Sequence, residues 1–192
     1  QLLGASPSMD PTWPIEAGLC RLRPFRVGDE ASLQRHADDR DIWRNVRDMF
    51  PHPYRLKDAV AWIARTSEAD PPTALAIEVD GACCGGIGYV LGSDIHRFSA
   101  EIGYWLGQEH WGKGVVSAAV NAMLPYGFRV FGLQRQWAGV IASNGASIRV
   151  LEKAGFVHEG VHRRAIFKDG AFRDEVVLGL TLADWEARSG KG

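Results

Sequence analysis

Hydrophobic and polar residues alternate along several stretches of the chain, and this period of two predicts β-strands. The Asp80-Gly81 pair between two of these stretches is a strong signal for a tight hairpin. A second hairpin is expected around Lys168-Asp169-Gly170. Strands are therefore predicted at residues 19–23, 73–79, 82–91, 98–106, 134–142, 156–167 and 171–182.

Elsewhere the apolar positions recur every three or four residues, which predicts amphipathic helices. Asp29 is placed to cap the first helix, and Gly155 is placed to end the helix at 145–154. Pro125 lies inside the longest helix, so we expect a kink or an early end there. The apolar face of the third helix is expected to include Val60 and Ile63. Helices are predicted at residues 30–36, 41–46, 57–67, 115–130 and 145–154, with a short one starting at 184.

The order of these elements predicts an α/β (α+β) fold. A helix that crosses between neighbouring strands favours parallel pairing, so we expect a mixed, mostly antiparallel twisted sheet of about seven strands with helices on both faces. A single domain is assigned to residues 19–188. Residues 1–18, with several glycines and prolines, are expected to be a poorly structured leader. Gln1–Ser8 precedes Met9, and we expect it to be an appended segment.

The composition is that of an ordinary globular protein and excludes few functions. Of the 192 residues, 46% are hydrophobic, and 22 lysines and arginines nearly balance 23 aspartates and glutamates. The net charge of −1 offers no long-range attraction to nucleic acid or to an anionic membrane, so neither is expected as a partner. No apolar run is long enough to span a bilayer, and the sequence predicts a cytoplasmic protein.

The three cysteines, Cys20, Cys83 and Cys84, do not form the even, spaced set of a disulfide framework. Because neighbouring side chains of a strand point to opposite faces, Cys83 and Cys84 are expected on different sides of the sheet. We interpret all three as small core residues in a reducing compartment. No Cys-x-x-Cys or histidine-rich spacing indicates a metal, and none is expected.

A glycine-containing turn connects the predicted strand at 98–106 to the predicted helix at 115–130. Gly112 and Gly114 would let a ligand approach the backbone closely. The first N–H groups of the helix have no partner within it, and the helix dipole adds partial positive charge, so this turn is suited to a phosphate or pyrophosphate. Lys113 can add charge. The spacing matches neither the phosphate loop of nucleoside triphosphatases nor the dinucleotide-binding fingerprint.

Three segments together resemble the GNAT acetyltransferase superfamily, and within it the RimJ/RimL branch of ribosomal-protein N-terminal acetyltransferases. They are GYWLGQEHWGKG at 103–114, SNGASIRVLEKAGFVHEG at 143–160 and KDGAFRDEVVLGLTLADW at 168–185. The resemblance covers roughly residues 19–185. It implies a GNAT fold and acetyl-CoA as co-substrate. The cysteines could suggest a covalent acyl-enzyme, but no His/Asp constellation is placed to activate one of them, so we expect direct transfer of the acetyl group to a primary amine in a ternary complex.

The resemblance assigns a group of residues to coenzyme A. In the family, the glycine turn holds the pyrophosphate and the later segment flanks the pantetheine arm. Trp111 and Val116 depart from the commonest family residues, and the bulk of Val116 narrows the expected pyrophosphate site. The cofactor-binding residues implied are Leu106, Trp111, Gly112, Lys113, Gly114, Val115, Val116, Ser117, Asn144 and Ser147.

Amine acetylation needs a base, a donor to the developing oxyanion and an acid for the departing thiolate. By resemblance Glu101 is the candidate base; the alternatives are a solvent-facing glutamate or an ion pair with Arg97. The N–H around Leu106 is the implied oxyanion donor. Leu151 occupies the position where many relatives carry an acidic tyrosine, so Ser147 is the candidate acid, or simply a helix serine that bonds to the backbone.

The acceptor is the least determined part. Phe50, Tyr54, Glu101 and Arg164 are the expected substrate-binding residues, drawn from a proline-rich loop, a strand and the last hairpin. The arginines of that hairpin favour the α-amine of a protein N-terminus. The alternatives are a polyamine, amino sugar or antibiotic as acceptor, or a CoA-binding module without catalysis. Exposed aromatic strands are compatible with a homodimer.

Overall fold

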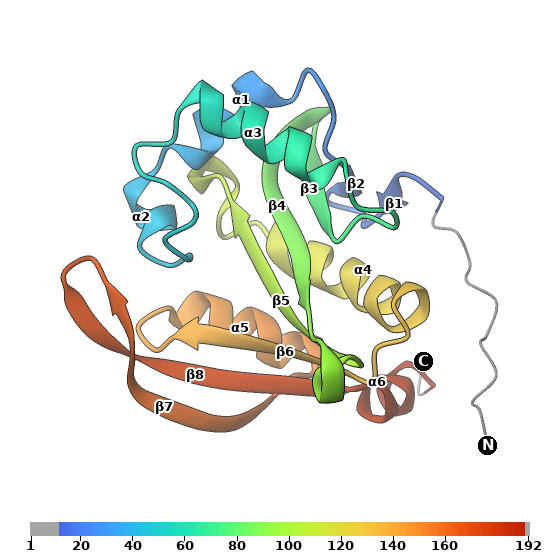
Figure 1. Cartoon of the computed structure of the whole chain (residues 1–192). Coiled ribbons are helices and arrows are strands. Elements are labelled where there is room, and N and C mark those ends of the chain that lie inside the picture. The colour runs from blue at the N-terminus through green and yellow to red at the C-terminus, as the bar shows by residue number, and fades with distance from the viewer. Residues whose placement is uncertain (1–11, 191–192) are drawn as a thin grey trace.

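The computed structural model describes residues 12–190, which form an eight-stranded sheet with helices on both faces (Figure 1). The strand order is β1-β2-β3-β4-β5-β6-β8-β7. Within the described residues, the strands are β1 (Ile15–Glu16), β2 (Arg21–Pro24), β3 (Ala74–Val79), β4 (Ala82–Leu91), β5 (Ser99–Leu106), β6 (Arg135–Ile141), β7 (Val157–Lys168) and β8 (Ala171–Thr181). The helices are α1 (Glu30–Ala37), α2 (Arg40–Trp43), α3 (Leu56–Thr66), α4 (Val115–Val130), α5 (Gly145–Ala154) and α6 (Leu182–Ser189), with 3₁₀ turns η1 (Asp94–His96) and η2 (Gln108–His110).

All neighbouring strands are antiparallel except β5 and β6, which are parallel. This is the position at which the α4 crossover predicted parallel pairing, so the mixed α/β fold is confirmed. The sheet has eight strands where about seven were expected. None of the helices in residues 12–190 is long and apolar enough to cross a membrane.

The eighth strand comes from the segment expected to be a leader. Ile15 pairs with Leu22 of β2, and the Trp13 ring lies 5.7 Å from that of Tyr126. Within residues 12–18 only Ile15–Glu16 form regular structure, and the apolar side chains of Trp13, Ile15 and Ala17 pack against the folded core. Residues 1–11, and with them the expectation that Gln1–Ser8 is an appended segment, lie outside the described residues.

The two faces of the sheet bury separate hydrophobic clusters. On β3, Leu75 and Ile77 pack on the side covered by α4 and α5, whereas Ala76 packs on the side covered by α1 and α3. Cys84 and Cys83 divide in the same way, and Cys20, Cys83 and Cys84 are all buried and free. The prediction that the adjacent cysteines face opposite sides is confirmed.

Most elements lie where the pattern predicts them. The observed bounds of β4, α4 and α5 are the predicted ones, whereas α2 is shorter and ends at Trp43. Val60 was expected on the apolar face of α3, but it is 51% exposed, while Ala59 and Ile63 on the same helix are buried. The apolar stripe of α3 is therefore narrower than its sequence suggests.

Asp29 occupies the position before α1, but its carboxylate does not cap the helix. It accepts two hydrogen bonds from the buried guanidinium of Arg23, both at 2.8 Å, and one from the Arg26 backbone N–H. Arg23 also pairs with Glu78 of β3, which is 7% exposed. The expected cap is thus replaced by a buried charge network, because the buried Arg23 would be left without a counter-charge if Asp29 turned to the helix end.

Helix α4 continues through Pro125, contrary to the expected break. Proline removes one helical hydrogen bond, the one to the Asn121 carbonyl. The helix also buries Val120, Met123 and Leu124 almost completely against the sheet. Burial of this apolar face outweighs the lost bond, since helices in proteins are stabilised mainly by tertiary packing.

Two buried polar side chains fasten α4 to the sheet. The Tyr89 hydroxyl lies 2.8 Å from the Met123 carbonyl and 2.7 Å from Gln136 Oε1. The Gln136 amide donates to the Leu124 carbonyl at 3.0 Å. This close approach requires a residue without a side chain at Gly127, where a Cβ would lie 2.5 Å from the Tyr89 hydroxyl.

We therefore predict that Gly127→Ala lowers the free energy of unfolding by about 1–3 kcal/mol, because an added methyl group overpacks the Tyr89–Gln136 contact. Chemical denaturation monitored by circular dichroism measures the change. Gly160→Ala is the control, since a Cβ at Gly160 meets no atom within 4 Å. Equal stabilities for the two variants would contradict this account of α4.

Candidate functional site

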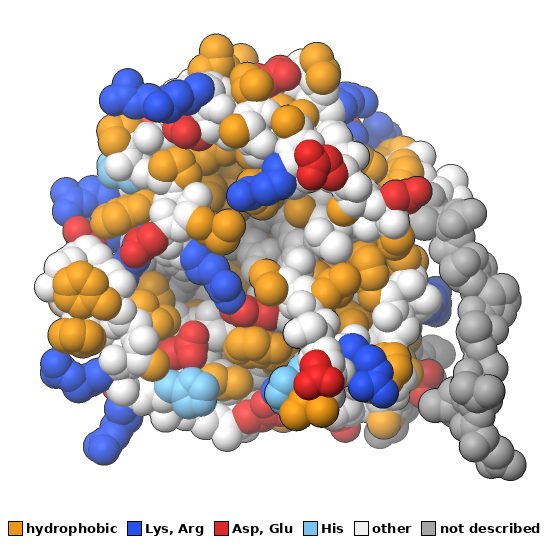
Figure 2. Space-filling view, viewed as in Figure 1, with side chains coloured by type: hydrophobic (Ala, Val, Ile, Leu, Met, Phe, Trp, Pro, Cys, Tyr) orange, Lys and Arg blue, Asp and Glu red, His pale blue; other side chains and the backbone are white. Residues whose placement is uncertain are grey.

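The parallel strands β5 and β6 pair over only three residues each, Ser99–Glu101 with Arg135–Trp137. Beyond these pairs β5 continues to Leu106 and β6 to Ile141, and the strands diverge (Figure 1). Side chains from both strands, α3, α5 and the loop before α3 line a cavity of about 950 Å³. Figure 2 shows this face of the molecule hollowed near its centre. The predicted site residues that line the cavity are Phe50, Tyr54, Glu101, Asn144 and Ser147.

The edge of β5 that faces the gap carries backbone groups without a strand partner beyond Glu101. On the other edge, the Gly107 N–H donates to the Cys84 carbonyl at 2.8 Å. Because successive amides of a strand point to opposite edges, the Leu106 N–H points toward the gap. The Leu106 carbonyl accepts a hydrogen bond from Trp111 Nε1 at 2.7 Å, which ties the start of the glycine turn to the end of β5.

The glycine turn has the backbone conformation that its residues require. Gly112 and Gly114 have φ values of 70° and 82°, in the left-handed region that other residues seldom adopt. Helix α4 then begins at Val115, and its first backbone bond runs from the Ala118 N–H to the Gly114 carbonyl. The N–H groups at 115–117 therefore have no acceptor within the helix, and its first turn carries no acidic residue to compete for them.

Asn144, Ser147 and Tyr104 meet on the β6 side of the cavity. Asn144 Oδ1 accepts a hydrogen bond from the Ser147 N–H at 3.2 Å, so Asn144 caps α5. The Ser147 hydroxyl lies 2.7 Å from the hydroxyl of Tyr104, which comes from β5. Burial raises the pKa of Tyr104 to about 12, and the hydrogen bond with Ser147 offsets part of this rise. Tyr104 thus stays protonated beside Ser147 at neutral pH.

Leu151 stands on α5 where many relatives carry a tyrosine, but a different tyrosine, Tyr104 of β5, reaches this part of the cavity. Leu151 is fully buried and lines the cavity, whereas Tyr104 reaches Ser147 across the gap. Tyr104 is not among the site residues predicted from the sequence. Side chains of a strand alternate between its two faces, so Tyr104 and Glu101 point to opposite faces of β5. Both can line one cavity only because β5 and β6 diverge, which opens both faces of β5 to it.

Glu101 lies in the cavity wall with 15% of its side chain exposed. Its carboxylate accepts a hydrogen bond from Arg47, which lies in the loop between α2 and α3. The alternative ion pair with Arg97 is wrong: Arg97 stacks on Phe98 and donates to the Asp94 carbonyl. Arg47 was not expected in the site, because nothing in the pattern of an irregular loop indicates where its side chains point.

Aromatic rings close the far end of the cavity. Phe50 lies 5.0 Å from Tyr54 and 5.3 Å from Trp105, measured between ring centroids. Tyr54 is 5% exposed, and burial raises the pKa of its hydroxyl to about 12. Phe50, Tyr54 and Trp105 of β5 therefore all line the cavity.

Arg164, the fourth expected substrate residue, does not reach the cavity. Its guanidinium lies over the Phe172 ring at 4.8 Å, and its backbone N–H donates to Asp174. Among the cavity-lining residues of the same hairpin are Ile166 and Glu175. Arg164 is displaced because β7 is irregular there, with a register shift between His162 and Ile166.

Residues 20–157 match the family described as acetyltransferase (GNAT) domain, which is more than half of the chain. The chain belongs to the GNAT acetyltransferase family. The predicted membership and the GNAT fold are thereby confirmed.

Individual relatives support the RimJ/RimL branch of the GNAT family. The probable N-acetyltransferase YjcK of Bacillus subtilis is 42% identical over 46% of this chain and 49% of its own. The [ribosomal protein uS5]-alanine N-acetyltransferase of Escherichia coli is 34% identical over 44% of this chain and 43% of its own. The matched region thus spans about half the length of these relatives. Mycobacterium smegmatis RimJ, solved with CoA-disulfide, has a TM-score of 0.78 at 28% identity, covering 91% of each chain.

The two departures from the GNAT loop pattern have a structural explanation. The indole N–H of Trp111 donates to the Leu106 carbonyl and so holds the turn against β5. Val116 is partly buried and packs against the core cluster under α4, so its bulk lies against the protein. Both residues therefore leave the N–H groups at the start of α4 without an acceptor within the helix.

We predict that Tyr104→Phe lowers the free energy of unfolding by about 0.5–1.5 kcal/mol, because it removes the hydrogen bond that joins β5 to Ser147 of α5. Thermal and chemical denaturation measure the loss. Tyr54→Phe is the matched control, since within residues 12–190 the Tyr54 hydroxyl has no hydrogen bond. An equal or greater loss of stability in the control would show that the Tyr104–Ser147 bond does not stabilise the contact between β5 and α5.

Proposed function

We propose that this chain transfers an acetyl group from acetyl-CoA to a primary amine, by direct attack of the amine on the thioester. One observation carries the proposal: the open edge of β5 lies between a helix start with free N–H groups and a cavity that contains the carboxylate of Glu101. A thioester carrier with a diphosphate and an amide-containing arm is complementary to such a surface.

The diphosphate of CoA would accept hydrogen bonds from the N–H groups of Val115, Val116 and Ser117. The amides of its pantetheine arm would pair with the free edge of β5 and with the amide nitrogen of Asn144. Lys113 and Trp111 flank this path. The structure of M. smegmatis RimJ, described as a complex with CoA-disulfide, supports CoA as the ligand of the shared fold.

In the transfer step, the amine nitrogen bonds to the thioester carbon and the carbon–sulfur bond breaks. Glu101 takes the proton of the amine, directly or through water, with Arg47 holding its carboxylate in the cavity wall. The Leu106 N–H stabilises the negative oxygen that develops on the carbonyl. Ser147 gives its proton to the departing thiolate and takes the Tyr104 proton in its place, and solvent returns a proton to Tyr104 as Glu101 releases the one taken from the amine.

A covalent acyl-enzyme is not favoured. Burial raises the pKa of Cys20 to about 11 and that of Cys83 to about 12, so these thiols stay protonated and are poor nucleophiles at neutral pH. Neither of them lines the cavity.

The α-amine of a protein N-terminus is the acceptor we favour. Its pKa near 8 leaves a larger neutral fraction at neutral pH than a lysine-like amine with a pKa near 10.4, so a single carboxylate base suffices. The E. coli relative is by name an N-acetyltransferase of an alanine in ribosomal protein uS5. The aromatic end of the cavity around Phe50 and Trp105 would receive the first side chains of such a peptide.

We predict that Gly114→Ala weakens CoA binding roughly tenfold, because forcing a Cβ into a left-handed conformation costs about 1–2 kcal/mol and distorts the turn. Isothermal titration calorimetry with CoA measures the affinity. Gly132→Ala is the control: Gly132 also has a positive φ, 62°, but lies beyond the other end of α4. Equal CoA affinities in the two variants would place the diphosphate elsewhere, and no saturable CoA binding to the parent protein would refute the proposed function.

We predict that Glu101→Gln lowers kcat/KM about 10²–10⁴-fold without loss of CoA affinity, because it removes the base and leaves the glycine turn intact. Ser147→Ala is expected to lower kcat alone. Thiol release from acetyl-CoA, measured with the acceptor that gives the highest rate, reports both effects. Glu68→Gln, an exposed glutamate outside the cavity, should behave like the parent protein. Full activity of the Glu101→Gln, Ser147→Ala double variant would remove both assigned roles.

The acceptor class is decided by a panel. Peptides with free and with blocked N-termini are incubated with acetyl-CoA beside polyamines and amino sugars, and intact mass reports each product. We expect a mass increase of one acetyl group on peptides with a free α-amine. Acetylation of the polyamines or amino sugars alone would replace the protein acceptor by a small molecule, and thioester turnover with none of them would favour a CoA-binding module.

A further inference from the structure

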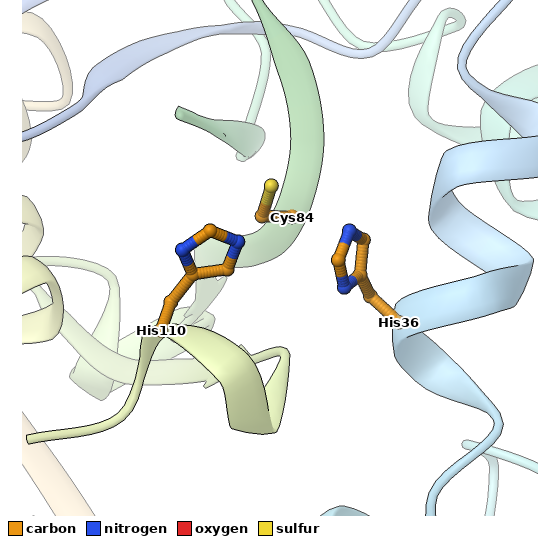
Figure 3. A group of neighbouring side chains, drawn as sticks. All are labelled: His36, Cys84 and His110. Atoms are coloured by element: carbon orange, nitrogen blue, oxygen red, sulfur yellow. The ribbon is translucent and has the colours of Figure 1, made fainter. Parts of the chain in front are cut away.

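Three side chains able to bind a metal converge from separate elements outside the lining of the acceptor cavity (Figure 3). His36 comes from α1, Cys84 from β4 and His110 from η2, and their ligand atoms all lie within 4.8 Å of one another. His36 is 8% exposed and Cys84 is 2% exposed. The proposed acetyl transfer uses none of the three.

One nitrogen in this group has an unmet bonding capacity. His110 Nε2 is buried and, among the described residues, has no hydrogen-bond partner. In Figure 3 this ring points toward His36 and Cys84. Buried polar atoms are almost always bonded, and an exception calls for an explanation such as a water or an ion. A cation between the three side chains would provide that bond.

A fourth donor lies next to the three. Glu109 Oε1 is 3.5 Å from His36 Nδ1 and 3.4 Å from His110 Nε2. Ligands bound tetrahedrally to zinc at about 2.1 Å lie roughly 3.4 Å from one another, so these two separations fit a shared ion. The ligand atoms of His36, Cys84 and His110 all lie within 4.8 Å of one another, so a closure of about 1 Å would bring the thiol to the separations of a zinc site with a Zn–S bond of about 2.3 Å.

The group is accessible to an ion from solvent. A surface hollow of about 420 Å³ is lined by Arg35, His36 and Glu109, together with Asp38, Asp39 and Gln108, and Arg35 lies 3.3 Å from Glu109 Oε2, the oxygen that does not face the histidines. Glu109 has half of its side chain exposed, so it can deliver an ion from this hollow to the buried ligands. The His36 ring lies so close to the backbone that position 107 requires glycine, since a Cβ there would lie 2.5 Å from His36 Nδ1.

We propose that His36, Cys84, His110 and Glu109 form a binding site for a zinc-class divalent ion. Two imidazoles, one thiolate and one carboxylate form a set that suits tetrahedral Zn²⁺ and, as a probe, Co²⁺. The ion would tie η2 to α1 and β4. Because η2 directly precedes the glycine turn, occupancy would stabilise the segment that positions Trp111.

Binding has a defined proton balance. The Cys84 thiol lies 3.4 Å from the Ala82 carbonyl as a weak donor. When the ion binds, a metal–sulfur bond forms, the thiol proton passes to solvent and the contact with Ala82 is lost. The imidazoles bind through neutral nitrogens. Affinity should therefore rise with pH as the released proton becomes easier to transfer to solvent.

The test uses the full chain after removal of metals with a chelator, titrated with Zn²⁺ in a calorimeter and with Co²⁺ in a spectrophotometer. We expect one ion per chain, a higher melting temperature with Zn²⁺, and in the Co²⁺ spectrum both tetrahedral ligand-field bands and a thiolate-to-cobalt charge-transfer band. His110→Ala and Cys84→Ser should each weaken binding by at least about tenfold. CoA binding is measured on the same samples, so a failed metal site and a failed CoA site are distinguished.

Matched controls separate this site from adventitious binding. Cys83→Ser changes a thiol on the same strand that faces the other side of the sheet, and His158→Ala changes an exposed histidine of β7. Both should bind Zn²⁺ as the parent protein does. No ion uptake by the parent protein, or no charge-transfer band with Co²⁺, overturns the proposal. It is also overturned if His110→Ala retains the parent affinity, or if the Cys83 and Cys84 variants lose affinity equally. Each of these readouts is independent of acetyl transfer.

Discussion

The short parallel ladder between β5 and β6 is the constraint on which the rest of the molecule depends. Its three residue pairs are held firmly, because Gln136 within them is completely buried and bonded to Tyr89 and to α4. Beyond Glu101 the two strands have no further pairs, so β5 presents backbone donors and acceptors that must find partners. A sheet that paired along its full length would have neither the cavity nor this free edge.

The same divergence explains why residues from both faces of β5 meet in one place. Glu101 and Trp105 face the aromatic end with Arg47 and Phe50, whereas Tyr104 reaches Ser147 on α5. The last hairpin closes the outer side through its tip. Lys168 is bonded to Asp48, and Asp169 pairs with Arg40 and Arg44, which attaches the hairpin to the segment around α2. The cavity is thus enclosed by contacts between segments that are distant along the chain.

The chain around η2 has a double role in this arrangement. Trp111 on one side ties the glycine turn to β5, and His110 on the other side faces His36 and Cys84. Gly107 lets the ring of His36 lie against the backbone at the end of β5. The start of α4 is therefore positioned from both sides by the side chains of Trp111 and His110, while the glycines themselves determine only the local conformation of the turn.

Local patterns in the sequence determined the elements and the ligand turn. The bounds of β4, α4 and α5, the opposite orientations of Cys83 and Cys84, and the parallel crossover all follow from short-range periodicity and chain connectivity. The left-handed Gly155 was likewise apparent, because a glycine in that conformation commonly ends a helix. The resemblance to GNAT enzymes rests on the same contiguous segments.

Only the tertiary structure decided which side chains meet. The Arg47–Glu101 pair, the Tyr104–Ser147 bond and the cluster of His36, Cys84 and His110 join residues from separate elements, with no spacing that marks them. Asp29 binds the buried Arg23 and does not cap α1, because charge pairing in the core outweighs the local preference. Pro125 lies within α4, because burial of the apolar face of the helix outweighs the hydrogen bond that proline removes. Periodicity reports on neighbours along the chain, whereas these contacts depend on how distant elements pack.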